Sequence, residues 1–261
     1  MDWSKKRKLS YLATLVGSLI LIIILISYFA LRKNPTCFDV IQNGSEVGID
    51  CGGTCALYCA SEMKPLRIVW VKPFLFTPGH YDIGAYIENP NQKAGIVSLR
   101  YTVRAFSEDK QKIAERTGVM EITPGSSSLL FEGNFSSATL PVRTEVEFDS
   151  NYQMTWRKAE RAEVKLVTKN YMIRYLEAGA RFDAVVVNTD PIIDAGRAVI
   201  GAIISDGGRN PIAISRTVID GVAKGSEQPI FFTWPEKFSG IPEVSQLIAD
   251  IVIMQSAVFQ K

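Results

Sequence analysis

The feature that most constrains this chain is a long apolar stretch close to its N-terminus. Residues 9–31 form 23 positions without a charged side chain, and residues 19–26 are all aliphatic. A helix of this length spans about 34 Å, enough to cross a hydrocarbon core of about 30 Å. A cleavable signal peptide has a shorter apolar region, of about 7–15 residues, and ends at a small-x-small site. Residues 27–30, Ser-Tyr-Phe-Ala, match such a site poorly, so we expect an uncleaved transmembrane helix at residues 9–31.

The charges that flank this stretch predict its orientation. Two basic residues follow it, Arg32 and Lys33, and four precede it: Lys5, Lys6, Arg7 and Lys8. The richer basic cluster stays in the cytoplasm, so residues 1–8 are predicted to form a cytoplasmic tail. The chain is therefore expected to be a single-pass protein of the plasma membrane, with its C-terminal domains extracytoplasmic.

Net charge argues against one class of function. Residues 1–33 hold six basic side chains and one acid, a net charge of +5. Because the whole chain has a net charge of +2, the remaining residues have a net charge of −3. A nucleic-acid-binding domain needs a basic surface. We therefore expect no nucleic-acid partner.

The cysteines support the same orientation. All four lie just past the apolar stretch: Cys37, Cys51, Cys55 and Cys59. An even, clustered set in an exported segment predicts two disulfides, which persist in oxidising compartments. Three pairings are possible, and the spacing does not choose among them. Because residues 32–63 are too few to build a core, we expect the disulfides to hold this juxtamembrane module in shape.

Residues 37–55 read C-x-D-x-I-x-N-G-x-E-x-G-x-D-C-G-G-x-C. This text resembles a short cysteine module found in exported and surface proteins, including membrane-anchored bacterial proteins. The module accompanies unrelated domains. The resemblance therefore implies export and implies no activity.

Oxygen-bearing side chains in the module raise the hypothesis of a calcium site: Asp39, Asn43, Glu46 and Asp50. Calcium prefers such oxygen ligands in a compact loop. The alternative is that the same residues form turns and stay solvated. A zinc or iron–sulfur site is disfavoured because the cysteine spacing lacks paired C-x2-C motifs. No cofactor is predicted.

The rest of the chain is predicted to be mainly β. Residues 96–107 alternate between apolar and polar side chains, a period of two that is typical of a strand buried on one face. Short strand-like runs recur on either side, and Pro, Gly and Asn turns separate them. Strands at this spacing predict an antiparallel sandwich.

The pattern repeats after about one hundred residues. Several landmarks recur at this offset: Asn89 and Asn188, Arg116-Thr117 and Arg216-Thr217, Gly125-Ser126 and Gly225-Ser226, and Phe131 and Phe231. We therefore predict two tandem copies of one domain, at residues 64–157 and 158–261. The charged run at residues 157–161 is expected to be the linker.

Residues 86–91 (Tyr-Ile-Glu-Asn-Pro-Asn) and 122–126 (Ile-Thr-Pro-Gly-Ser) carry a second resemblance. They are similar to late-embryogenesis-abundant type 2 domains and to the related FxLYD-like sandwiches. The resemblance implies tandem immunoglobulin-like β-sandwiches of seven strands, usually without enzymatic activity. It carries no catalytic residues to this chain.

A search for catalytic motifs gives the same expectation, that the chain is not an enzyme. The sequence contains one histidine, His80, in a Pro-Gly-His-Tyr turn. Ser61 and Ser107 each begin an S-x-x-K match, but no K-T-G accompanies either. No catalytic residue is predicted.

A possible contact surface is predicted at Phe231 and Phe232. Adjacent residues of a strand point to opposite faces, so one ring is expected on an outer face. We expect a membrane-anchored binding or structural protein whose tandem sandwiches engage an envelope protein or the envelope itself. The alternative is an envelope protein that holds a small ligand or lipid in a sandwich cavity. A less favoured alternative is an enzyme of unrecognised type.

Overall fold

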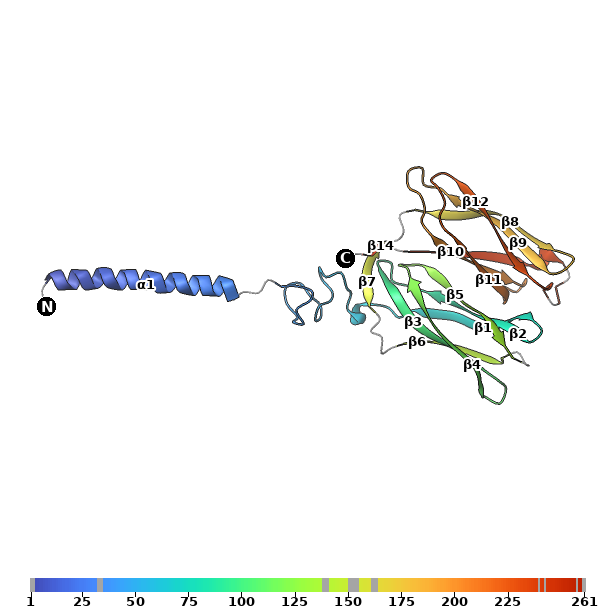
Figure 1. The fold of residues 1–261 in the computed structure, drawn as a ribbon, viewed down its shortest axis with the longest axis horizontal. Helices are drawn as coiled ribbons and strands as arrows, with labels where there is room; N and C mark the ends of the chain where they lie inside the picture. Colours follow the sequence, from blue (N-terminus) through green and yellow to red (C-terminus); the bar gives the residue numbers. More distant parts are fainter. Residues whose placement is uncertain are drawn as a thin grey trace.

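The computed structural model describes residues 3–31, 35–137, 141–149, 155–160, 164–238, 240–241, 243–256 and 258–259. It consists of an N-terminal helix, a small module with two disulfides and two antiparallel β-sandwiches (Figure 1). This confirms the fold class predicted from the sequence.

Helix α1 spans Trp3–Leu31. Within it, Lys6–Phe29 is long and apolar enough, by length and composition, to cross a membrane, and the described residues bury none of this span. The exposed aliphatic side chains surround the helix, whereas a helix that covers a protein core has a one-sided apolar stripe. The side chain of Lys5 and residues Arg32 and Lys33 lie outside the described residues.

The first sandwich contains seven strands: β1 (Arg67–Thr77), β2 (His80–Glu88), β3 (Ala94–Phe106), β4 (Lys112–Ile122), β5 (Ser127–Ser136), β6 (Arg143–Phe148) and β7 (Trp156–Glu160). One sheet has the order β1-β2-β5. In the other, β3 pairs with β4 on one edge and with β6 and β7 on the other. Alternate side chains such as Ile83, Ile87 and Val103 are buried between the two sheets.

The second sandwich contains six strands: β8 (Leu166–Tyr175), β9 (Ala180–Asn188), β10 (Ala198–Ser205), β11 (Pro211–Ile219), β12 (Glu227–Trp234) and β13 (Ile248–Gln255). Its sheets have the orders β12-β9-β8 and β11-β10-β13. The central strands β9 and β10 thus correspond to β2 and β3. Phe182 and Phe232 stack in its core with ring centroids 5.8 Å apart. Two short 3-10 helices, Ala60–Glu62 and Val244–Gln246, lie outside these strands.

Two buried asparagines occupy the same place in the two copies. The Asn89 side-chain amide donates to the carbonyl oxygens of Ala94 (2.7 Å) and Thr123 (2.9 Å). In the second copy, Asn188 donates to Ile193 (2.9 Å) and Val222 (3.0 Å). Each asparagine tethers the turn after one strand to the turn before a strand of the same sheet. The sequence landmark is therefore a structural one.

The two sandwiches pack face to face through a third apolar cluster, which we call the seam. The outer face of β1-β2-β5 meets the outer face of β11-β10-β13 at buried residues Phe74, Leu129, Ile203, Ile214 and Val252. Two glycines permit the close approach: a Cβ on Gly84 would lie 2.4 Å from Ile214 Cδ1, and one on Gly201 would lie 2.7 Å from Leu129 Cδ2. The four sheets thus form a stack of layers, with the seam in its middle.

Strand β7 joins both ends of the globular part. Its inner edge pairs with β3, and its outer edge pairs with Leu57 of the cysteine module and with the C-terminal strand β14 (Val258–Phe259). Figure 1 shows β14 beside β7, on the side of the module. The expected boundary between residues 157 and 158 falls inside β7. The charged run predicted as a linker lies largely in β7. The buried side chains of Trp156 and Ala159 hold this strand in the sheet.

Candidate functional site

The cysteine module is closed by two interleaved disulfides. Cys37 is bonded to Cys55 and Cys51 to Cys59, the pairing that the sequence left open. The sequence separations are 18 and 8 residues. Because all four sulfurs are bonded to one another, none is a free thiolate that could bind zinc or an iron–sulfur cluster.

The four oxygen-bearing residues of the calcium hypothesis bind the module's own chain. The Asp50 carboxylate accepts hydrogen bonds from the backbone N–H groups of Asp39 (3.0 Å) and Val40 (3.0 Å). Glu46 accepts one from the Asn43 backbone at 3.1 Å. The hydrogen bond that the Asn43 amide donates to Asp39 (2.9 Å) helps to hold the pKa of that carboxyl below its usual value.

These carboxylates do not form a group of three within metal-ligand distance of one another in the described part of the chain. The group that does is Cys37, Glu46 and Cys55, and two of its members share a disulfide. The Asn43 Oδ1 atom is buried without a hydrogen-bond partner. Calcium binding by the module therefore stays a prediction.

The two adjacent phenylalanines lie on opposite faces of β12. Phe232 is 2% exposed and packs in the core, whereas Phe231 is 57% exposed on the outer face of β12-β9-β8. The Arg181 guanidinium lies 4.4 Å from the Phe231 ring centroid. Arg181 and Arg174 both pair with Asp183, the residue in register with Phe231, at 2.8 and 2.5 Å.

Phe231 is the second copy's equivalent of a residue in the seam. In the first copy, Phe131 pairs in register with Gly84, five residues before Asn89. In the second, Phe231 pairs with Asp183, five residues before Asn188. The Phe131 ring packs against the seam, with Arg216 of the other sandwich 5.5 Å from its centroid. The position that joins the two copies at Phe131 is therefore solvent-exposed in the second copy, at Phe231.

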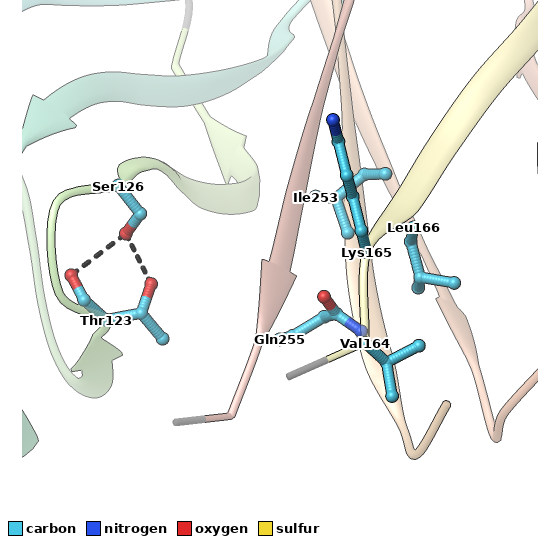
Figure 2. Close-up of a pocket in the computed structure, with 7 residues that line it drawn as sticks. All are labelled: Thr123, Ser126, Val164, Lys165, Leu166, Ile253 and Gln255. Atoms are coloured by element: carbon cyan, nitrogen blue, oxygen red, sulfur yellow. Dashed lines mark hydrogen bonds between the residues drawn. The ribbon is translucent and has the colours of Figure 1, made fainter. Parts of the chain in front are cut away.

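A pocket of about 310 Å³ lies between the sandwiches. Figure 2 shows Thr123 and Ser126 of the first copy on one side, and residues at the start of β8 and the end of β13 on the other. Val164, Leu166 and Ile253 supply apolar walls, and Lys165 contributes a cation. The alternative function predicted from the sequence was a ligand cavity inside a sandwich, and sequence reasoning treated residues 123–126 as a turn only.

His80 lies at the exposed start of β2, as expected for a turn histidine. Its Nδ1 atom is 3.2 Å from the Ser136 hydroxyl. The Ser107 hydroxyl donates to the Gln111 carbonyl across a turn (3.4 Å), and Ser61 lies in the 3-10 helix Ala60–Glu62. The absence of enzymatic activity remains an expectation.

Asp82, on β2, is a buried carboxyl group that sequence reasoning missed. It is in register with Phe74 of the seam, and its Oδ1 atom accepts a hydrogen bond from the Asn134 backbone at 2.9 Å. Desolvation by burial raises the pKa of Asp82 above its usual 3.8, against the lowering effect of that hydrogen bond. The folded state therefore binds this proton more tightly than the unfolded state.

A raised pKa in the folded state predicts a loss of stability as the pH rises through it. Asp82→Asn keeps the acceptor oxygen and removes the charge, so we expect it to stabilise the chain at pH 7 and to lose this advantage near pH 4. Asp206→Asn is the control. The pKa of Asp206 is lowered, mainly by the backbone hydrogen bond from Asn210, so its substitution should destabilise at pH 7. Urea unfolding at both pH values measures the two differences. A pH-independent effect of Asp82→Asn would contradict the prediction.

Comparisons with known proteins show no related family. No family model matches the sequence, and no curated protein matches it. Among solved structures, red sea bream transglutaminase is 12% identical over 79% of this chain, with a TM-score of 0.23. The chain spans 31% of that enzyme's length. The calcium binding domain CBD12 of CALX1.1 is 10% identical over 65% of this chain and 75% of its own, with a TM-score of 0.21. Similarity at this level supports no argument about function, and no residue role is transferred from these proteins.

Proposed function

We propose that this chain is a membrane-anchored extracytoplasmic protein that binds another protein of the envelope through the outer face of its second sandwich. The observation that carries the proposal is the exposed Phe231, which stands where Phe131 joins the two sandwiches in the first copy. Aromatic rings beside arginines are typical of the residues that dominate binding energy in protein interfaces.

Two features support the anchoring part of the proposal. The apolar span Lys6–Phe29 leaves its side chains exposed on every side, which suits a lipid environment better than water. Disulfides such as those of the adjacent module persist in oxidising compartments, which supports an extracytoplasmic location for the domains after the helix. The basic cluster before the helix, including Lys6, Arg7 and Lys8, fits a cytoplasmic N-terminus.

The binding part rests on the chemistry around Phe231. Its ring lies against Arg181, and both Arg181 and Arg174 contact Asp183. The face thus offers an apolar centre with a charged rim, the arrangement of many non-obligate interfaces. A partner that covers the ring and pairs with the arginines is the type that this face fits.

Site-specific photocrosslinking in the native host tests this proposal. A photoreactive residue at position 231 is expected to capture a defined protein, and one at Val119 is expected not to. Val119 is a matched control because it is also exposed, at 58%, but lies on the first sandwich. With the captured partner purified, Phe231→Ser should weaken binding by about 30-fold or more, the effect of losing a central aromatic, and Val119→Ser should leave it unchanged.

Two results would contradict the proposed surface. The first is equal capture at positions 231 and 119. The second is an undiminished affinity of Phe231→Ser for a partner that position 231 captures. Crosslinking to lipid or to wall polymer alone would assign the face to the envelope itself.

The pocket between the sandwiches supports a second candidate function, the binding of a small ligand. Its volume of about 310 Å³ is at the lower end for small-molecule sites. Native mass spectrometry of the full chain, released from host membranes in detergent, would show the added mass of such a ligand. Leu166→Trp, which fills the pocket, should remove that mass. A bare mass for the wild-type chain would exclude a tightly held ligand.

A further inference from the structure

The cysteine module exposes a set of large apolar side chains. Five of them are between 52% and 82% exposed: Phe38, Val40, Ile41, Val47 and Ile49. All five lie within the short stretch that the disulfides enclose. In water, each exposed apolar side chain forgoes the stabilisation that burial would supply. Such a concentration in a segment this small marks a contact surface.

Three carboxylates and the four sulfurs of the module are engaged within it. The carboxylates of Asp39, Glu46 and Asp50 accept hydrogen bonds from the module's own backbone, and the four sulfurs are joined in disulfides. The three carboxylate residues are thus half-buried and bound within the module, whereas its five large apolar side chains are exposed.

The backbone at Val40 shows how firmly this arrangement is held. Val40 has a φ of 61°, a left-handed conformation that is rare for a β-branched residue. Its N–H donates to both carboxylate oxygens of Asp50, at 3.2 and 3.0 Å. The carboxylate therefore helps to fix a turn that leaves the Val40 side chain 75% exposed beside Phe38 in sequence.

The module lies close to helix α1 in the sequence, and this indicates what covers its exposed side chains. Helix α1 ends at Leu31, and Phe38 follows seven residues later. Seven extended residues reach at most about 25 Å, so Phe38 stays close to the bilayer surface when the helix spans it. At its other end the module is held to β7, where the Tyr58 N–H donates to the Trp156 carbonyl at 2.9 Å.

We propose that the exposed apolar side chains of this module insert into the outer interface of the membrane that α1 spans. The proposal rests on the anchoring part of the proposed function. The bilayer supplies an apolar phase within the reach of the tether, and the module presents five exposed apolar side chains to it. The inserted module, bound to β7, sets the sandwiches close to the lipid surface.

Tryptophan quenching by brominated lipid tests the insertion. The full-length chain carrying Phe38→Trp is reconstituted into phosphatidylcholine vesicles with bromine near the top of the acyl chains. After subtraction of the signal of the wild-type chain, which has four tryptophans, we expect Trp emission from position 38 to fall at least about twofold. Val119→Trp, on the first sandwich, is the matched exposed control and should show no quenching. Ile49→Trp supplies a second reporter in the module, and intact mass without free thiols confirms that each variant keeps its disulfides.

The outcomes separate the insertion from the anchoring. If alkaline extraction releases the chain from vesicles, the anchoring fails and the insertion fails with it. If the chain stays in the membrane but positions 38 and 49 are unquenched, the insertion alone is overturned. Unquenched reporters together with a specific protein crosslink from position 38 in the host would overturn it in favour of a protein contact. Quenching at both positions, without quenching at 119, supports it.

Discussion

The Asn188→Ala variant is expected to lose about 3–5 kcal/mol of unfolding free energy. The Asn188 side chain is 0% exposed and satisfies three backbone groups, the carbonyls of Ile193 and Val222 and the N–H of Asp190. A buried backbone group left without a partner costs about 1–3 kcal/mol. Alanine replaces none of the three hydrogen bonds, although the Val222 carbonyl keeps the one that it accepts from the Ala195 N–H. Urea denaturation of the full chain in detergent, followed by circular dichroism, measures the change.

Two further variants make this prediction specific. Asn89→Ala should have an effect of similar size, because Asn89 makes the corresponding three hydrogen bonds in the first copy. Asn210→Ala is the control, since the Asn210 side chain is exposed and hydrogen-bonds to Asp206 across a turn. It should cost less than about 1 kcal/mol. An Asn188→Ala variant as stable as Asn210→Ala would show that the turns hold without the asparagine.

The second large effect is expected at the seam, from Leu129→Asp. Leu129 is buried between the sandwiches and lies against Gly201, so a carboxylate at this position would be desolvated. Burial of a charge in an apolar contact costs several kcal/mol. We expect the variant to lose at least about 3 kcal/mol and to unfold in two calorimetric transitions, because the sandwiches no longer stabilise each other.

Val119→Asp is the matched control for the seam. It introduces the same charge at an exposed position of the same sandwich. Its unfolding free energy should therefore stay within about 0.5 kcal/mol of the wild-type value. If Leu129→Asp unfolds in a single transition with an unchanged midpoint, the seam contributes little to the stability of the chain. The pairing of β14 with β7 would then be what couples the two sandwiches.

Much of the fold was predictable because its determinants are local. The alternation in β3 and the repeated Asn89 and Asn188 reflect side-chain periodicity and turn hydrogen bonds, and both are legible in a single sequence. The apolar helix and the two disulfides follow from composition in the same way. The opposite faces of Phe231 and Phe232 follow from the pleat of a strand, although only the structure shows which ring is exposed.

The remaining features depend on contacts between distant segments. Cysteine pairing depends on the course of the backbone in three dimensions, which the spacing of the cysteines does not encode. The pocket is formed by residues of both copies, at the place where they meet. The seam did have a signal: β10 reads Ala-Val-Ile-Gly-Ala-Ile-Ile, an unbroken apolar run that indicates burial on both faces. β7 was misread as a linker because the charged residues 157, 158 and 160 obscure the inward-facing Trp156.

The geometry of the seam also bears on how separate molecules of this chain could associate. It joins unlike sheets, β1-β2-β5 of one sandwich to β11-β10-β13 of the next, so it is a head-to-tail contact. Repeated between molecules, such a contact would produce an open-ended filament. The two terminal faces that would meet carry ion pairs, Arg104 with Glu115 (2.6 Å) on one and Arg174 with Asp183 (2.5 Å) on the other. Burying both pairs would cost desolvation energy that the apolar seam avoids. A third unit stacked on either end would therefore meet a charged face, which opposes head-to-tail polymerisation.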